Sequence, residues 1–282
     1  MTRSALTKHA KIAPGVIHML GLFVVASPCM APQLNVSQKV GEMKCQFTGP
    51  EQLTVADLEV LLGLIALAGV QTDSFKSHRQ LTGSNPDIRL RQMLTMQLVV
   101  RTTYSELARE LGRSTGGATW PLLKQSIARL SAVRVIIKPI YGTAYDESPL
   151  FAPLRTDGSK DSIALNLSPV LAAAVLGGPG EFVQVSMEVF RSLKDKSGVA
   201  CALYFRLHSL HAGQDHTITV DRLVKLVYGD DVPQASLRKS RSRVKAAMLK
   251  IAVRTGWSVE VENGVCRFHR PGKAAVKDTE SS

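Results

Sequence analysis

The chain has 282 residues, of which 45% are hydrophobic and 21% are charged, a composition that excludes a largely disordered protein and supports two folded units of ordinary size. The net charge of +12 favours polyanionic partners, and no run of apolar residues predicts a membrane span. The four cysteines lack the close pairing of zinc sites and are too few for a disulfide framework, so they indicate reduced thiols in a cytoplasm.

Residues 1–50 are interpreted as an N-terminal extension. An apolar stretch at 16–26 follows three basic residues and precedes Ser27-Pro28-Cys29, an order that fits two interpretations. One is a signal peptide for export. The other, which we favour because His18 interrupts the stretch, is a short helix or strand that packs on the first folded unit. Residues 34–48 predict a β-hairpin.

Residues 51–180 predict a first winged helix-turn-helix domain. Its pattern is helix, turn, helix and a wing of two paired strands at 133–137 and 163–167. A glycine-rich run at 177–180 marks the domain boundary. The other predicted elements are an apolar helix at 54–69, a helix from Thr102 or Thr103 to Leu111, a turn at 112–117, a helix at 120–132 and a small helix at 169–176.

Residues 181–273 repeat this order and predict the second winged helix-turn-helix domain, the main DNA-binding unit. Asn263-Gly264 is a strong two-residue hairpin signal and predicts its wing, with strands at 257–262 and 265–270. The fold class is therefore α+β, mostly helical, with tandem winged helix-turn-helix domains and a disordered tail at 274–282. The remaining predicted elements are a strand at 183–185, helices at 186–193 and 198–211, a strand at 217–220, a helix at 221–228 and a long helix at 233–255.

The long helix carries the functional prediction. Residues 234–273 hold ten basic and two acidic residues, so two-thirds of the net charge lies in this segment. Between Gln234 and Arg254 there is no acid, and like charges repel at a spacing of four residues, which favours a polyanionic partner over a merely solvated face. Leu237, Val244, Met248 and Ile251 recur at helical spacing and predict one apolar stripe. We expect the apolar part at 246–253 to be buried and the part at 238–245 to enter the major groove of DNA. The residues predicted to contact DNA are Arg238, Lys239, Arg241, Ser242, Arg243 and Lys245, together with Arg267 and Arg270 on the wing.

The first domain has fewer basic residues at the corresponding helix. We expect auxiliary DNA contacts from Arg113, Lys124 and Arg129, or contacts to a partner subunit in a homodimer. A purely structural domain is the alternative.

Signals for catalysis are weak. No phosphate-binding glycine loop is present, and no His-x-His pair accompanies a tyrosine as a nicking enzyme would require. His208, His211 and His216 lack acidic or thiol co-ligands, and Asp230 and Asp231 are interpreted as caps of the basic helix. We therefore expect no enzymatic activity, no metal and no cofactor.

The chain resembles the RepC replication initiators of IncQ-type broad-host-range plasmids. The resemblance rests on the order of several moderately specific motifs over roughly residues 45–270. They are Phe47–Leu53, the helix end Gly63–Gly69, Tyr104–Gly112, Ile163–Gly178, Val183–Leu193, Leu237–Val244 and Gly256-Trp257.

The resemblance implies two winged-helix domains that bind tandem repeats, called iterons, in origin DNA and open nearby AT-rich DNA. It also implies two partners, the plasmid helicase RepA and the primase RepB. Only positions 238–245, Arg267 and Arg270 are carried over as DNA contacts. The N-terminal segment shares Ala13-Pro14-Gly15 with the family but is more apolar, so no N-terminal DNA contact is carried over.

Two other functions stay open. A winged-helix transcriptional repressor would fit the same DNA-binding unit, and it would be recognised by a single palindrome over a promoter in place of direct repeats. A nicking enzyme is the third hypothesis, which relaxation of supercoiled plasmid would reveal.

Overall fold

The computed structural model describes residues 6–25, 33–73, 86–141, 145–156, 161–176, 182–230 and 232–272. The domain boundary predicted at 177–180, the cap Asp231, Cys29 and the tail at 274–282 lie outside these ranges. Within them the fold is a mixture of helices and small sheets. Helices make up 46% of the described residues, so the expectation of a mostly helical protein is wrong.

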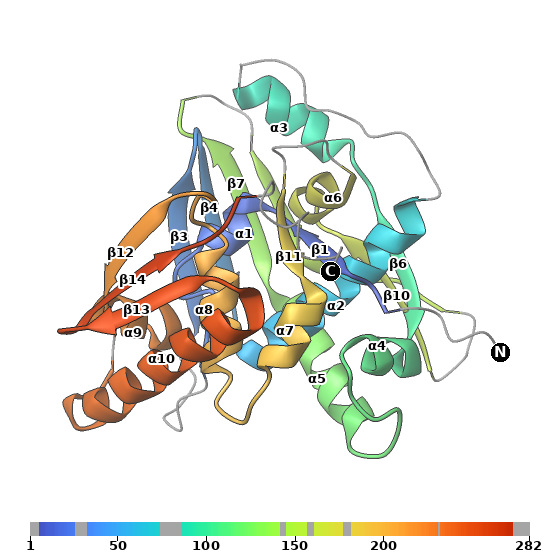
Figure 1. Ribbon diagram of the computed structural model, residues 1–282. Helices are drawn as coiled ribbons and strands as arrows, with labels where there is room; N and C mark the ends of the chain where they lie inside the picture. The colour runs from blue at the N-terminus through green and yellow to red at the C-terminus, as the bar shows by residue number, and fades with distance from the viewer. Residues whose placement is uncertain are drawn as a thin grey trace.

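The first part of the chain surrounds one long apolar helix, α2, which lies in the middle of the molecule (Figure 1). α2 contacts β1, β6, α4, α5 and α6. It is the one described helix long and apolar enough to cross a membrane, but 61% of that stretch is buried within the fold, as expected of a core helix. The elements of this part are β1 (His9–Ile12), α1 (Pro14–His18), β2 (Phe23–Val24), β3 (Leu34–Val40), β4 (Met43–Gly49), β5 (Leu53–Thr54), α2 (Val55–Asp73), α3 (Pro86–Leu94), β6 (Val99–Thr103), α4 (Tyr104–Glu110), α5 (Thr119–Ala132), β7 (Arg134–Pro139), β8 (Asp146–Pro149), β9 (Phe151–Pro153), β10 (Ser162–Leu167) and α6 (Pro169–Leu176).

The second part is built on α8, whose residues are all buried. α10 packs against α7, α8 and α9, and the three-stranded sheet has the order β12-β14-β13. The predicted hairpin turn is present, with positive φ angles of 48° at Asn263 and 77° at Gly264. The elements are β11 (Val183–Ser186), α7 (Met187–Leu193), α8 (Val199–Leu207), β12 (Asp215–Thr219), α9 (Val220–Tyr228), α10 (Gln234–Thr255), β13 (Ser258–Glu262) and β14 (Val265–His269).

Local capping signals explain several of these helix starts. The Thr103 hydroxyl accepts a hydrogen bond from the Glu106 N–H, and the Glu106 carboxylate accepts one from the Thr103 N–H, which is a complete capping box at α4. Ser186 and Thr219 cap α7 and α9 in the same way through their hydroxyls. α10 starts differently: its N-cap is Pro233, and Asp230, which we expected to cap it, forms an ion pair with Lys225 at 3.2 Å.

The wing predicted for the first unit is wrong in its pairing. The strands β7 and β10 exist, but they lie in different sheets. β7 pairs with β4 and β8, so the predicted N-terminal hairpin β3–β4 extends into a four-stranded sheet of order β3-β4-β7-β8. β10 pairs with β6 and β9 instead. Two of these strands, β8 and β9, lie between the two strands predicted to form the wing.

The N-terminal segment packs on both halves of the chain. β1 pairs antiparallel with β11, from His9 opposite Ser186 to Ile12 opposite Val183. The buried guanidinium of Arg206 on α8 donates hydrogen bonds to the carbonyls of Ile17 and Met19. The apolar stretch at 16–26 therefore supplies core residues in its described part, and the buried side chains of both halves form one hydrophobic cluster.

Candidate nucleic-acid interface

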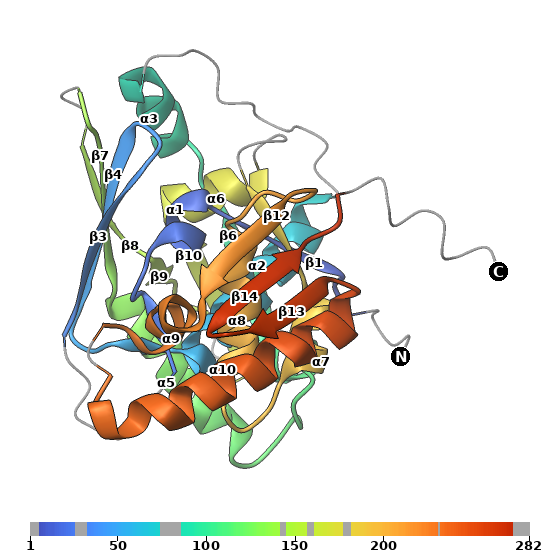
Figure 2. The ribbon, with the colours of Figure 1, turned by 60° about the vertical axis from the view of Figure 1, so that its left-hand side comes forward.

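The N-terminal half of α10 presents a row of exposed cations. Arg238, Lys239, Arg243 and Lys245 are all exposed, and none of them forms an ion pair with another described residue. Ser242 is exposed between them. Figure 2 shows the N-terminal half of α10 at the lower left edge of the molecule. Four unneutralised charges within two helical turns form a surface that attracts a polyanion.

Arg241 differs from its neighbours. Its Nε and Nη2 donate hydrogen bonds of 2.6 and 2.9 Å to the two carboxylate oxygens of Asp221 on α9, although both side chains are exposed. The bonds from Arg241 lower the pKa of the Asp221 carboxyl, so the pair stays ionised. The expectation that no acid compensates the basic helix is therefore wrong at this position. Asp221 orients the guanidinium and reduces its free charge.

One side of α10 anchors it to the protein. Val244, Met248 and Ile251 of the predicted apolar stripe are buried, with Leu237 half-buried. The C-terminal half is less buried than expected, because Leu249 and Val253 are 52% and 81% exposed. The helix thus lies on the surface along its whole length, and only one stripe faces the core.

The two wing arginines have different surroundings. Arg267 is exposed and faces Glu260 across the hairpin at 3.5 Å, a distance at which the ion pair is weak. Arg270 is half-buried: it donates hydrogen bonds to the carbonyls of His208 and Leu210, and its guanidinium lies 5.8 Å from the Trp257 ring centre. Burial lowers the pKa of Arg270. Arg270 therefore holds the hairpin to the core, and only Arg267 is presented to a ligand.

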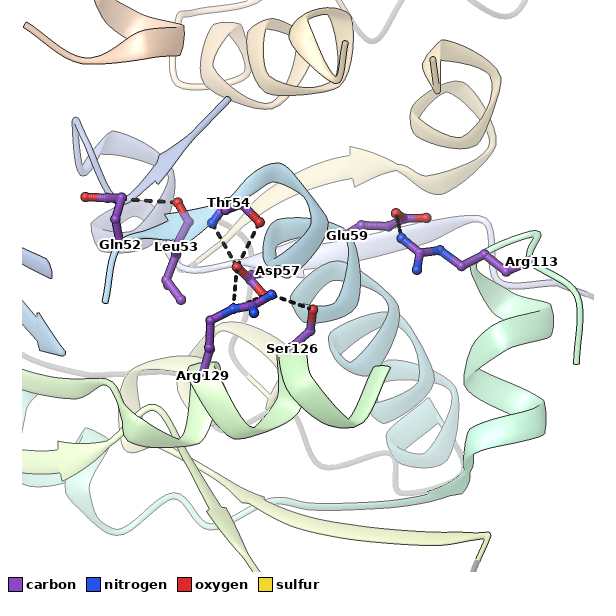
Figure 3. A network of polar contacts seen from close by, with 8 residues as sticks. All are labelled: Gln52, Leu53, Thr54, Asp57, Glu59, Arg113, Ser126 and Arg129. Carbon is purple, nitrogen blue, oxygen red and sulfur yellow. Dashed lines mark hydrogen bonds and ion pairs between the residues drawn. The ribbon is translucent and has the colours of Figure 1, made fainter. Parts of the chain in front are cut away.

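The auxiliary positions of the first unit are mostly engaged inside the protein (Figure 3). Arg129 forms a two-pronged ion pair with the fully buried Asp57, with its Nη2 2.7 Å from Oδ1. Arg113 forms an ion pair with Glu59 at 2.5 Å. Lys124 is the exception, since it is exposed and lies over the Tyr104 ring at 5.2 Å. The structure thus gives Arg113 and Arg129 a structural role that the sequence did not indicate, and we leave them out of the interface.

Cysteine and histidine side chains are the other candidate functional groups among the described residues. No group of three or more His, Cys, Asp or Glu side chains there could hold a metal ion. Burial raises the pKa of Cys45 and Cys266 to about 11 and that of Cys201 to about 12, so these thiols stay protonated at neutral pH. His208 is buried and its Nδ1 lies 2.7 Å from the Tyr204 carbonyl, while His216 Nε2 lies 2.8 Å from the His211 carbonyl.

Comparison with known proteins gives two consistent results. The fold resembles two crystal structures of domains 2 and 3 of RctB. The first has a TM-score of 0.54 at 11% identity and covers 91% of this chain and 95% of that chain. The second, of selenomethionine derivatives, has a TM-score of 0.57 at 12% identity and covers 93% and 100%. At such low identity the likeness shows a shared fold. No curated protein matches the chain.

The family comparison defines the class of protein, a replication initiator. The model of Replication protein C matches residues 6–272, nearly the whole chain. The protein therefore belongs to the RepC family.

Proposed function

We propose that this protein starts replication of an IncQ-type plasmid by binding iteron repeats in double-stranded origin DNA. In this proposal α10 is the recognition helix in the major groove, and the β13–β14 hairpin contacts the adjacent backbone through Arg267. The protein acts in the cytoplasm as a binding protein without catalytic activity.

The observation that carries this proposal is the set of free cations on α10. Four exposed basic side chains repel one another along one helix and have no acid partner among the described residues, a state that phosphate groups stabilise. The helix is held by a buried stripe on its other side, so its position is fixed before DNA binds. Arg238, Lys239, Arg243 and Lys245 are the main contacts, and Arg241 and Ser242 join them once a phosphate or base competes with Asp221.

The element order around α10 supports a winged-helix interpretation. α8, β12, α9, α10 and the hairpin follow one another in sequence, and β12 pairs with β14 to close a three-stranded sheet. In the first unit α4, a glycine-containing turn and α5 have the same order, but their sheets are arranged differently. We therefore assign DNA reading to the second unit. Of the predicted auxiliary positions, Lys124 alone remains as a backbone contact of the first.

The later steps come from the family resemblance. We propose that binding to the repeats opens nearby AT-rich DNA and brings in the helicase RepA and the primase RepB, and that the first unit holds a second subunit. Chemical probing of unpaired bases in supercoiled origin DNA tests the opening step directly.

The central experiment titrates labelled duplex DNA with the protein at several salt concentrations and measures binding by fluorescence anisotropy. The test variant is Arg238→Gln/Arg243→Gln. The charge-matched control is Lys196→Gln/Arg254→Gln, which removes two exposed cations outside the N-terminal half of α10. Each lost phosphate contact lowers the slope of log affinity against log salt by about 0.9, and each lost two-pronged base contact costs about 1–3 kcal/mol. Unchanged affinity and slope in the test variant would refute the interface.

Footprinting on the DNA beside the gene separates the initiator from the repressor. Protection of several direct repeats of about 20 base pairs, near two helical turns apart, next to an AT-rich stretch supports the initiator. Protection of one palindrome over a promoter supports the repressor. Metal-dependent relaxation of supercoiled plasmid would identify a nicking enzyme.

A further inference from the structure

The four-stranded sheet β3-β4-β7-β8 has an outer face that no part of the proposed interface uses. Its side chains alternate along each strand, and the inner set, including Cys45, Phe47, Val135 and Ile137, is buried. The outer set is mostly polar, with four basic residues and one acid. It comprises Asn35, Ser37 and Lys39 on β3, Lys44, Gln46 and Thr48 on β4, Arg134, Ile136 and Lys138 on β7, and Glu147 and Pro149 on β8.

Three lysines form a row across this face. The strand register places Lys39 directly opposite Lys44, and Lys44 directly opposite Lys138. All three are exposed, and none forms an ion pair within the described part of the chain. Neighbouring strands are about 4.8 Å apart, so the Cα atoms of these three lysines lie within about 10 Å. Like charges directly opposite each other destabilise a sheet, and a bound anion removes this cost.

An exposed aromatic ring continues the row. The register of β7 and β8 ends with Ile137 opposite Asp146, and its next step brings Tyr145 beside Lys138 on the outer side. Tyr145 is 55% exposed, and its hydroxyl donates a 2.6 Å hydrogen bond to Glu147, which directs the side chain along β8. Tyr141, just beyond the end of β7, is 87% exposed. The face therefore combines a line of cations with rings whose surfaces are open to solvent.

The lysine row and α10 are at different places on the molecule. Lys39 and Lys44 flank the tip of the β3–β4 hairpin, and Figures 1 and 2 both show this tip near α3, at the opposite end of the sheet from α10. In Figure 2 the sheet stands at the left edge of the molecule, with the labelled helices on its other side. A duplex bound along α10 does not need this row for its own contacts.

We infer that the lysine row and Tyr145 form a second nucleic-acid site, which binds single-stranded DNA. Lysines on a flat sheet can follow a sugar-phosphate backbone, while the exposed ring stacks on a base. Stacking requires an unpaired base, because in a duplex the faces of the bases are covered by their neighbours. A four-stranded sheet is also wider than the α-helix or two-stranded ribbon that the major groove admits. This site stands on its own observations and does not depend on the duplex interface at α10.

The test measures binding of labelled oligo(dT) and of a duplex of equal length by fluorescence anisotropy over a salt series. In the variant Lys39→Gln/Lys44→Gln/Lys138→Gln we expect the salt slope for oligo(dT) to fall by about 2, since each contact with a single strand contributes about 0.7. Duplex affinity should stay as in the wild type. Tyr145→Ala should bind oligo(dT) at least about fivefold more weakly, and Tyr145→Phe, which keeps the ring, should not.

A charge-matched control distinguishes a site from general attraction. Lys8→Gln/Arg155→Gln/Lys196→Gln also removes three exposed cations, none of them on the sheet face. The inference is overturned if this control weakens oligo(dT) binding as much as the lysine-row variant does, or if the lysine-row variant binds oligo(dT) like the wild type, which would assign the row to another partner such as an acidic protein. Equal loss of oligo(dT) and duplex binding in the lysine-row variant also overturns it, because the row would then belong to the duplex site.

Loss of duplex binding alone, in the Arg238→Gln/Arg243→Gln protein, leaves this site intact and bears only on α10. Thermal unfolding checks that each variant folds, and removing the lysine repulsion should not lower the melting temperature.

Discussion

Replacing Arg129 with Met tests whether this arginine stabilises the fold or contacts DNA. The Asp57 carboxylate is fully buried at the start of α2, and Arg129 is the cation bound to it, with a side chain only 14% exposed. Met keeps most of the apolar volume of the arginine stem but leaves the carboxylate without a counter-charge. The variant therefore removes a charge from a buried pair and leaves packing nearly intact.

The expected loss follows from what remains around Asp57. Breaking a buried ion pair by removing one partner costs about 3–5 kcal/mol. The backbone N–H and the hydroxyl of Thr54 still donate hydrogen bonds of 2.8 and 2.9 Å to Asp57, so we expect a loss near the lower limit, about 3 kcal/mol. In Asp57→Asn/Arg129→Met no ionised group is left buried at this position, and the loss should fall to about 1–2 kcal/mol.

Urea unfolding followed by far-UV circular dichroism and by tryptophan fluorescence measures these differences. Coinciding transitions would justify a two-state free energy, since Trp120 and Trp257 report on different parts of the chain. Duplex affinity of folded Arg129→Met should equal that of the wild type. A loss of stability below about 1 kcal/mol, or a double variant less stable than the single one, would refute the reasoning. Reduced duplex affinity with unchanged stability would restore Arg129 as a DNA contact.

Three further outcomes are expected. Burial lowers the pKa of His208 from 6.5 to about 3, so below pH 6.5 the unfolded chain takes up a proton that the folded one does not. The free energy of unfolding should therefore fall as the pH falls from 6.5 towards 3, by about 1 kcal/mol between pH 6.5 and pH 5.5, and His208→Gln should remove this contribution in urea unfolding at the two pH values. In Gly63→Ala the added Cβ would lie 2.6 Å from Leu111 Cδ2, and the crowding should cost about 1–3 kcal/mol in thermal unfolding while leaving DNA binding intact; a variant as stable as the wild type would contradict the close approach. Asp221→Asn should release Arg241 and steepen the salt dependence of duplex binding by about 0.9, and an unchanged slope would show that Arg241 does not reach the phosphates.

Local signals predicted individual elements well. Helix α4 begins with the capping box of Thr103 and Glu106, and the β13–β14 hairpin turns at Asn263-Gly264. The predicted apolar stripe of α10 is confirmed at Val244, Met248 and Ile251, which are buried. Helical periodicity could predict them because it depends only on residues within a few turns.

Strand partners were not predictable in the same way. The alternation at 134–139 shows that a strand exists and which face is buried, but β4 and β10 both offer an apolar inner face to pair with. The choice of β4 brings together residues about ninety positions apart, and it assembles a lysine row that no sequence window contains.

The sequence shows where charged residues occur, but it does not show which residues form ion pairs with them. Asp57 and Glu59 lie near the start of an otherwise apolar helix, and in the structure they bind Arg129 and Arg113, which are 72 and 54 residues away in the sequence. A signal was present, since acids on an otherwise apolar helix are costly to bury without a cation. The number of free cations at a DNA interface therefore cannot be read from composition alone.

The pairing of β1 with β11 constrains how this chain can be made and divided. Residues 9–12 leave the ribosome early, yet their hydrogen-bonding partners at 183–186 follow more than 170 residues later. Until residues 183–186 are synthesised, β1 has no partner strand. Pairing between such distant segments slows folding, and an unpaired strand edge can pair with the wrong segment. A fragment that begins after residue 180 lacks the partner strand of β11, so its behaviour in isolation would describe a molecule with this sheet incomplete.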